Sequence, residues 1–135
     1  SNIKNKKISF LGVTFKPNTD DMRDSSSLKM IPYLCKKGAK VNYYDPSGEK
    51  SEFRKIKNCY YRNNIKSNCY NADLVILLTE WDEFKSLDFK NIIKKRNFKV
   101  YDLRNLYSAD EMKKNSTWIN QELNNFKSLV KNYKI

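Results

Sequence analysis

The sequence predicts an α/β fold, a three-layer Rossmann-like domain with a mostly parallel sheet and helices on both faces. Two patterns indicate it. Short runs of β-branched and aromatic residues alternate along the chain with segments whose apolar residues have helical spacing. One run, Leu74 to Leu78, is apolar without interruption, which is typical of a strand covered on both faces. The length of 135 residues suits one compact domain.

The first predicted strand is a run of β-branched and aromatic residues: Ile8, Phe10, Leu11 and Val13. A helix is expected next, because four apolar residues fall on one helical face: Leu28, Ile31, Leu34 and Cys35. Ser25 or Ser26 is the expected N-cap, since its hydroxyl can accept a hydrogen bond from the first turn, and Gly38 is the expected stop. Pro32 lacks an N–H for the preceding turn, which predicts a kink or a late helix start.

The second strand is expected at Lys40 to Tyr44, closed by a turn, and the Asn-rich stretch after it is expected to be irregular. The apolar run from Leu74 gives the third strand. Directly after it, Thr79 and Asp82 fit a T-x-x-D capping box, which predicts a helix at the strand end. A last short strand is expected from Phe98 to Asp102.

Residues 120–135 are expected to form a C-terminal amphipathic helix, because apolar residues recur at helical spacing: Ile119, Leu123, Phe126, Val130 and Tyr133. This helix is expected to pack on the domain or on a partner subunit, and a membrane-surface helix is the alternative. The chain starts with Ser1 instead of Met, so residues 1–6 are interpreted as a tag remnant and a linker from missing upstream domains. The main domain is expected to span residues 7–119.

The composition excludes several kinds of site. The chain has no His, which rules out His-based acid–base catalysis and His-containing metal sites. Its three cysteines form no C-x-x-C pair: Cys35, Cys59 and Cys69. Buried structural thiols are therefore favoured over disulfides, a zinc site or a nucleophile, and no metal site is expected. No signal peptide or membrane-length apolar run is visible, which favours the cytoplasm and no membrane association.

The net charge of +12 indicates an anionic partner. However, the excess is mostly lysine scattered along the chain, which is typical of a solvated surface. The charge leaves open an alternative function, a basic α/β module that binds nucleic acid or a protein partner.

Parallel sheets bind ligands at the carboxyl ends of their strands, which makes the loop from Thr14 to Asp24 the first candidate site. Only Gly12 is present there, so neither G-x-G-x-x-G nor a P-loop exists, and NAD binding in the Rossmann manner is not expected. Lys16 and Arg23 could hold a diphosphate. The alternative is that they pair with the acids of the loop: Asp20, Asp21 and Asp24. Asp45 is interpreted as turn-forming, with a ribose-binding acid as the alternative.

Four segments carry a resemblance to a known family. Residues 12–25 fit the pattern G-x-x-F-K-x-x-T-x-D-x-R-x-S, and residues 38–46 fit G-a-x-V-x-x-Y-D-P. Residues 72–84 fit A-D-x-x-x-x-x-T-E-W-x-E-F, and residues 102–105 fit D-x-R-N. In this order and spacing they resemble the C-terminal, UDP-binding domain of UDP-glucose/GDP-mannose dehydrogenases. The T-E-W tripeptide is most similar to the UDP-glucose 6-dehydrogenase branch.

The resemblance implies a nucleotide-sugar-binding domain of an NAD-dependent enzyme that oxidises UDP-glucose to UDP-glucuronate in two hydride transfers. Phe15 and Lys16 match positions that contact the nucleotide sugar, and Arg104 matches one that contacts the substrate. Arg23 matches an arginine that reaches NAD, a cofactor bound mainly by the N-terminal domain.

The resemblance also places the catalytic Cys in other domains, so no catalytic residue is expected in this fragment, which should be inactive alone. The implied partners are a UDP-sugar, the missing N-terminal and central domains of the same chain, and a second copy in a homodimer. Nucleic acid is not among them.

Overall fold

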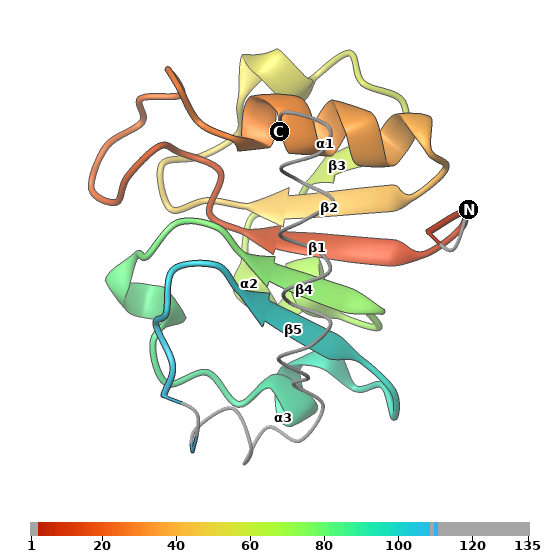
Figure 1. Ribbon diagram of the computed structural model, residues 1–135, viewed down its shortest axis with the longest axis vertical. Helices are drawn as coiled ribbons and strands as arrows, with labels where there is room; N and C mark the ends of the chain where they lie inside the picture. The colour runs from red at the N-terminus through yellow and green to blue at the C-terminus, as the bar shows by residue number, and fades with distance from the viewer. Residues whose placement is uncertain (1–2, 109, 111–135) are drawn as a thin grey trace.

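The computed structural model describes residues 3–108 and residue 110. Within them the strands form one five-stranded sheet in the order β3-β2-β1-β4-β5, and all four neighbouring pairs are parallel (Figure 1). The strands are β1 (Lys7–Leu11), β2 (Lys40–Tyr44), β3 (Cys59–Tyr61), β4 (Leu74–Leu77) and β5 (Lys99–Asp102). The predicted parallel sheet is therefore confirmed.

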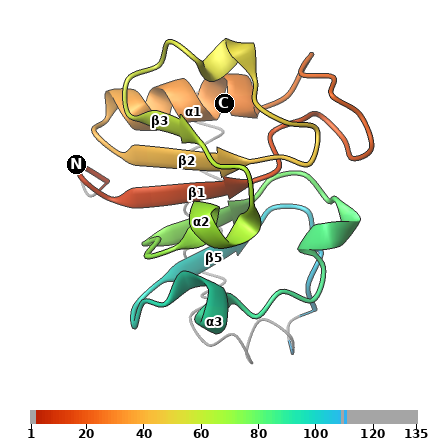
Figure 2. The same cartoon turned by 180° about the vertical axis from the view of Figure 1, so that it is seen from behind.

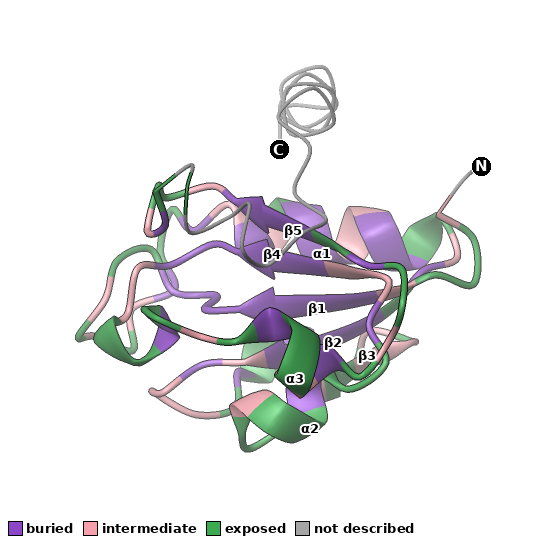
Figure 3. Ribbon diagram, turned by 90° about the horizontal axis from the view of Figure 1, so that it is seen from below, coloured by how far each residue is buried: buried purple, intermediate pink, exposed green. Residues whose placement is uncertain are grey.

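Helices cover both faces of this sheet. The helix α1 (Ser27–Lys36) lies on one face, and the shorter helices α2 (Ile65–Cys69) and α3 (Phe89–Ile93) lie on the other (Figures 2 and 3). Two short 3-10 helices, η1 (Ser51–Phe53) and η2 (Asp82–Phe84), belong to the connections. The three-layer, Rossmann-like arrangement predicted from the sequence is confirmed.

The alternation of side chains along the strands divides the core into two clusters. In β1, Ile8 and Phe10 join the cluster beneath α1, whereas Leu11 joins the cluster beneath α2 and α3. In β4, Ile76 and Leu77 divide between the two clusters in the same way. Successive residues of a strand point to opposite faces, so an uninterrupted apolar run is what a sheet covered on both faces requires.

The helix α1 begins where expected but is capped differently. Ser26 occupies the N-cap position without a side-chain hydrogen bond to the helix. Instead, the Ser25 hydroxyl accepts from the backbone N–H of Ser27 at 3.2 Å. Pro32 lies inside the helix, so the late start considered from the sequence is wrong. At the other end Gly38, with φ of 96°, follows the last turn as predicted, since glycine enters the left-handed region without strain.

Two sequence expectations about the middle of the chain are wrong. The Asn-rich stretch is not irregular throughout, because it contains η1, β3 and α2. The T-x-x-D segment does not cap a helix either. Trp81 is the N-cap of η2 and has no capping hydrogen bond, while the hydroxyl of Thr79 donates to the carbonyl of Thr14 at 2.7 Å. This threonine therefore serves the contact between two loops instead of a helix end.

Two further expectations concern the C-terminal helix and membrane association. The predicted C-terminal helix at residues 120–135 lies outside the described residues. In the described part of the chain, no helix has the length and apolar character needed to span a bilayer.

Candidate functional site

The carboxyl edge of the sheet brings the candidate loops together. From β1 the chain runs to β2 on one side, and it later returns to β4 on the other side of β1. At such a switch point the connections leave in opposite directions and open a crevice beyond the carboxyl ends of the strands. The loop between β1 and α1 projects past these strand ends (Figure 1). The crevice between the ends of β1 and β4 is therefore the geometric candidate for a ligand site.

A buried carboxylate fixes the start of the β1–α1 loop. Asp45, directly after β2, is 1% exposed, and its Oδ2 accepts hydrogen bonds from the backbone N–H of Val13 at 2.8 Å and of Thr14 at 3.2 Å. Its Oδ1 accepts from the backbone N–H of Ser47 at 2.9 Å. The predicted turn-forming role is confirmed by this last bond. The additional bonds to the neighbouring loop were not expected, and they occupy the carboxylate that a ribose would need.

The end of β4 holds the same loop from the other side. The Thr14 carbonyl accepts from the hydroxyl of Thr79, and the Thr14 hydroxyl lies 3.3 Å from the indole Nε1 of Trp81. Gly12 permits this close approach. Its φ is 84°, and a Cβ at that position would lie 2.5 Å from the Cβ of Thr79. The loop is thus held between the ends of β2 and β4.

Two serines at the start of α1 hold the backbone carbonyl of Val13. The hydroxyls of Ser25 and Ser27 lie 2.5 Å and 2.6 Å from the Val13 carbonyl oxygen, and both side chains are buried. The serine-rich entry to α1 therefore anchors the loop in addition to starting the helix.

Lys16 and Phe15 follow the anchored segment directly and are both exposed. Phe15 is 49% exposed, which is unusual for a large apolar side chain, although a single exposed aromatic residue is not by itself a site. Among the described residues, the Lys16 ammonium has no hydrogen-bond or ion-pair partner. The structure therefore leaves this cation at the carboxyl edge available to an anion.

Arg104 lies at the carboxyl ends of β4 and β5. Its Nε donates to the carbonyl of Leu78 at 2.7 Å and lies 3.8 Å from the Glu80 carboxylate. The turn that carries it is fixed by Asp102, whose Oδ1 accepts from the Arg104 backbone N–H at 3.2 Å. With 37% of its side chain exposed, Arg104 has guanidinium N–H groups left for a ligand beyond the bond to Leu78.

Arg23 is placed differently from the other two cations. Its side chain is 88% exposed and forms a bidentate pair with Asp21 at 2.9 Å. The side-chain hydrogen bond from Arg23 is the main cause that lowers the pKa of Asp21 to about 2. The internal ion pairing considered from the sequence therefore occurs for Arg23 and Asp21. Lys16 forms no salt bridge among the described residues, although its charge also lowers the pKa of Asp21.

The residues whose contacts the sequence did not reveal share a recognisable position. Thr14, Asp45 and Thr79 are small polar residues that follow the ends of three adjacent strands, β1, β2 and β4. All three are buried. A polar residue after each of several neighbouring parallel strands is a signal that the sequence contained, but only the strand order shows that the three meet.

The cysteines lie away from this edge. Cys35 and Cys69 are buried, and Cys59 is partly buried. The Cys35 thiol donates to the carbonyl of Asn58 at 3.7 Å. The neighbouring Cys35 thiol and burial raise the pKa of Cys59, and burial raises the pKa of Cys69 to about 12. In residues 3–108 and 110, no cluster of His, Cys, Asp and Glu has the arrangement of a metal site.

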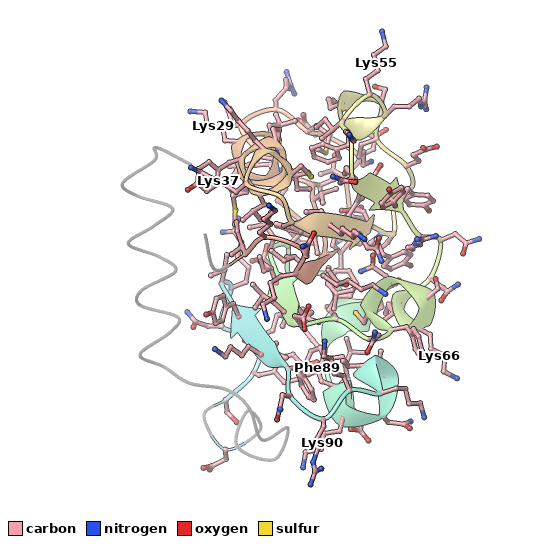
Figure 4. All side chains as sticks on the ribbon, turned by 90° about the vertical axis from the view of Figure 1, so that its right-hand side faces the viewer. Lys29, Lys37, Lys55, Lys66, Phe89 and Lys90 are labelled. Atoms are coloured by element: carbon pink, nitrogen blue, oxygen red, sulfur yellow. The ribbon has the colours of Figure 1, made fainter. Side chains whose placement is uncertain are left out.

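The excess positive charge is spread over the molecule. Lys29 on α1, Lys37 directly after it, Lys55 after η1, Lys66 on α2 and Lys90 on α3 point outward on different sides (Figure 4). Within the described residues these lysines do not gather on one face, which agrees with the solvated surface expected from their scatter in the sequence.

Comparison with known proteins gives consistent matches. Residues 9–109 match the family model described as "UDP-glucose/GDP-mannose dehydrogenase family, UDP binding domain". The UDP-glucose 6-dehydrogenase of Rhizobium meliloti (strain 1021) is 40% identical over 115 residues, which are 83% of this chain and 26% of that protein. The UDP-glucose 6-dehydrogenase TuaD of Bacillus subtilis (strain 168) is 36% identical over 115 residues, which are 82% of this chain and 24% of that protein.

Solved structures show the same fold. A UDP-glucose dehydrogenase from Pyrobaculum islandicum superposes with a TM-score of 0.65 at 25% identity, over 81% of this chain and 24% of that one. An NDP-N-acetyl-D-galactosaminuronic acid dehydrogenase from Methanosarcina mazei Go1 superposes with a TM-score of 0.72 at 24% identity, over 87% of this chain and 24% of that one. The chain spans about a quarter of the length of these relatives.

Proposed function

The chain belongs to the UDP-glucose/GDP-mannose dehydrogenase family, as its UDP-binding domain, and we propose that it holds the nucleotide sugar of an NAD-dependent UDP-glucose 6-dehydrogenase. In this proposal the whole enzyme oxidises UDP-glucose to UDP-glucuronate in two hydride transfers. The observation that carries it is the unpaired ammonium of Lys16, presented by an anchored loop at the switch point of a parallel sheet. A diphosphate is the part of a UDP-sugar that such a cation binds, because charge-assisted hydrogen bonds are the strong ones.

Arg104 provides the second cation of the proposed site. Its Nε is engaged by the Leu78 carbonyl, which fixes the plane of the guanidinium, and its remaining N–H groups can donate to the substrate. Phe15 supplies an exposed apolar ring beside Lys16, suited to pack on the nucleotide sugar. The site proposed for UDP-glucose thus consists of Phe15, Lys16 and Arg104.

Arg23 is proposed to reach the cofactor. It lies on the projecting loop with 88% of its side chain exposed, so it can contact a ligand held by another domain. NAD would be bound mainly by an N-terminal domain, since this chain lacks the glycine pattern of a dinucleotide loop. NAD supplies the hydride acceptor when bound.

We assign the catalytic step of the proposed enzyme to other domains. The chain has no His, and its cysteines do not lie at the carboxyl edge. We therefore assign the catalytic Cys to the N-terminal and central domains of a longer chain, with residues 7–119 as the UDP-sugar domain and a homodimer as the working enzyme. Cytoplasmic location belongs to the same proposal, because the three cysteines are free, which fits a reducing compartment.

Calorimetric titration of the 135-residue chain with UDP tests the proposal. We expect saturable binding, and Lys16→Ala should lower the affinity about tenfold, because one charge-assisted hydrogen bond is lost. Arg104→Ala should lower the affinity for UDP-glucose by a similar factor. Lys29→Ala, which removes an outward lysine of α1, is the control and should change nothing. Binding of any polyanion with steep salt dependence, without UDP selectivity, would instead favour the basic module.

The full-length enzyme tests the role of Arg23. The Arg23→Ala variant should raise the KM for NAD more than the KM for the nucleotide sugar. An equal rise of both constants would contradict the assignment.

A further inference from the structure

The backbone N–H groups of residues 12–15, at the start of the β1–α1 loop, already donate hydrogen bonds within the protein. In dinucleotide-binding loops, such groups and those of the following helix N-terminus bind the pyrophosphate. Here the N–H groups of Gly12 and Phe15 donate to the carbonyls of Tyr44 at 2.8 Å and Asp21 at 3.3 Å. Those of Val13 and Thr14 donate to Asp45, as described above. The loop from Gly12 to Phe15 therefore has no backbone donor left for a phosphate.

The entry to α1 is equally closed. The N–H of Ser27 donates to the Ser25 hydroxyl, and the N–H of Leu28 donates to the Ser25 carbonyl at 3.2 Å. The N–H groups of Lys29 and Met30 donate to the Ser26 carbonyl. The first turn thus satisfies its donors internally. Neither this turn nor residues 12–15 offer a backbone N–H to a diphosphate, and the Lys16 side chain is the candidate donor beside them.

We propose that Asp45 and Thr14 are positioning residues, which hold the first loop so that the side chain of Lys16, and not the loop backbone, binds the diphosphate. This inference rests on the proposed function. In this proposal, the Asp45 carboxylate accepts the hydrogen bonds of the Val13 and Thr14 backbone N–H groups, which a ligand phosphate would otherwise accept.

The path from Asp45 to Lys16 is continuous. Asp45 fixes the peptide of Thr14, and the Thr14 hydroxyl donates to the carbonyl of Lys16 at 3.0 Å. The same hydroxyl lies 3.4 Å from Oδ2 of Asp45, so its single proton favours the nearer Lys16 carbonyl, while its oxygen accepts from the Trp81 indole N–H. The backbone from which the Lys16 side chain starts is thereby tied to the ends of β2 and β4.

The charge of Asp45 is balanced on the side away from the loop. The Ser47 hydroxyl donates to Oδ1 of Asp45 at 2.5 Å and accepts from the Lys50 ammonium at 2.6 Å. Lys50 is only 5% exposed. Because buried charged groups require partners, these contacts supply Asp45 with hydrogen-bond partners inside the fold, and Lys16 is not one of them.

A double-mutant cycle on the 135-residue chain tests the inference. Thr14→Val keeps the shape of the side chain and removes its hydroxyl, whereas Thr14→Ser keeps the hydroxyl. We expect Thr14→Val to weaken UDP binding several-fold while Thr14→Ser restores it, with uridine affinity unchanged in both. In the Lys16→Ala background Thr14→Val should have no further effect, because Thr14 acts through Lys16.

Three outcomes would overturn it. Additive losses from Thr14→Val and Lys16→Ala would show that Thr14 acts separately from Lys16. Equal losses for uridine and UDP would show a general structural role. A wild-type chain that binds no UDP would overturn the proposed function and this inference with it, whereas normal UDP binding with an additive cycle would overturn this inference alone.

Amide resonances give a second, independent readout. In a titration with UDP followed by ¹H–¹⁵N correlation spectra, the backbone amides of Val13 and Thr14 should shift no more than that of Lys29, a control residue on α1. A large downfield shift of the Val13 or Thr14 proton would show a hydrogen bond to phosphate and would contradict the inference.

Discussion

An aspartate accepts hydrogen bonds at both edges of the sheet, but its partners differ between the amino edge, where the strands begin, and the carboxyl edge, where they end. At the amino edge, Asp73 accepts from the backbone N–H of Lys7 at 2.9 Å and from the ammonium of Lys95, and the Lys7 ammonium donates to the Tyr70 carbonyl. At the carboxyl edge, the carboxylate of Asp45 is satisfied mainly by backbone N–H groups.

The two edges also differ in the partners of three lysine side chains. The amino edge pairs Lys7 and Lys95 within the fold, whereas the carboxyl edge leaves the ammonium of Lys16 without a partner among the described residues. The two edges therefore differ in the partners of their carboxylates: a lysine ammonium and a backbone N–H for Asp73, and mainly backbone N–H groups for Asp45.

Removal of the two carboxylates should have the largest effect on this comparison. Asp45→Ala leaves two buried N–H groups unpaired and removes the carboxylate that Lys50 reaches through the Ser47 hydroxyl, so it should lower the free energy of unfolding by about 4 kcal/mol. Asp73→Ala removes a partly exposed pair and should lower it by about 1 kcal/mol. Urea unfolding at pH 7 measures both. Equal losses would mean that the two edges are held in the same way.

Glycine substitutions test how tightly each edge is packed. Gly12→Ala should lower the free energy of unfolding by about 3 kcal/mol, because it adds a contact of 2.5 Å with Thr79 to the strain of a positive φ. Gly38→Ala, at the amino edge, should lower it by about 1 kcal/mol. Its new Cβ would meet the flexible side chain of Lys4 at 3.0 Å.

Thermal or urea unfolding of the two variants decides this point. A loss for Gly38→Ala as large as that for Gly12→Ala would remove the contrast in packing. Gly48→Ala is a further control, since its φ is 101° and a Cβ there would meet nothing within 4 Å.

The smallest expected effect is a pH dependence at the amino edge. Burial raises the pKa of Asp73, but hydrogen bonds from Lys95 and the Lys7 backbone outweigh it, and the pKa lies below its ordinary value. The stabilising contribution is thus present above the unfolded-state pKa of about 3.9, and it is lost as the pH falls through the folded-state pKa.

Asp73→Asn removes this titration. In urea unfolding between pH 6 and pH 2.5, roughly the range around the ordinary carboxyl pKa, the wild type should lose more stability than Asp73→Asn. The two proteins should become similar at the acid end. A constant difference across the range would show that the ionisation of Asp73 does not contribute.

Much of the fold could be predicted because its signals are local. The strands β1, β2, β4 and β5 were expected from short apolar runs, and α1 from the spacing of its apolar residues. The elements β3, α2 and α3 were missed, since they have only three, five and five residues and most of their side chains are at least partly exposed. Elements this short have no periodic pattern to detect.

The candidate site, too, could be predicted only in part. Phe15, Lys16, Arg23 and Arg104 were identified from motifs in the sequence, and their binding roles stay predictions. The structure shows that Arg23 pairs with Asp21 while Lys16 is unpaired among the described residues, a difference that composition did not resolve. Thr79 illustrates why: its T-x-x-D context predicted a cap, but the carbonyl of Thr14 is its partner.

The sequence alone determined the fold class, the position of the main strands along the chain and the loop that carries the candidate cations, because each depends on residues close together in the chain. Tertiary structure decided which polar groups pair, because those choices join distant residues: Asp45 bonds Val13 across 32 positions, and Thr79 bonds Thr14 across 65. A hydrogen-bonding side chain has several acceptable local partners, and only the packing of β1 between β2 and β4 selects one of them.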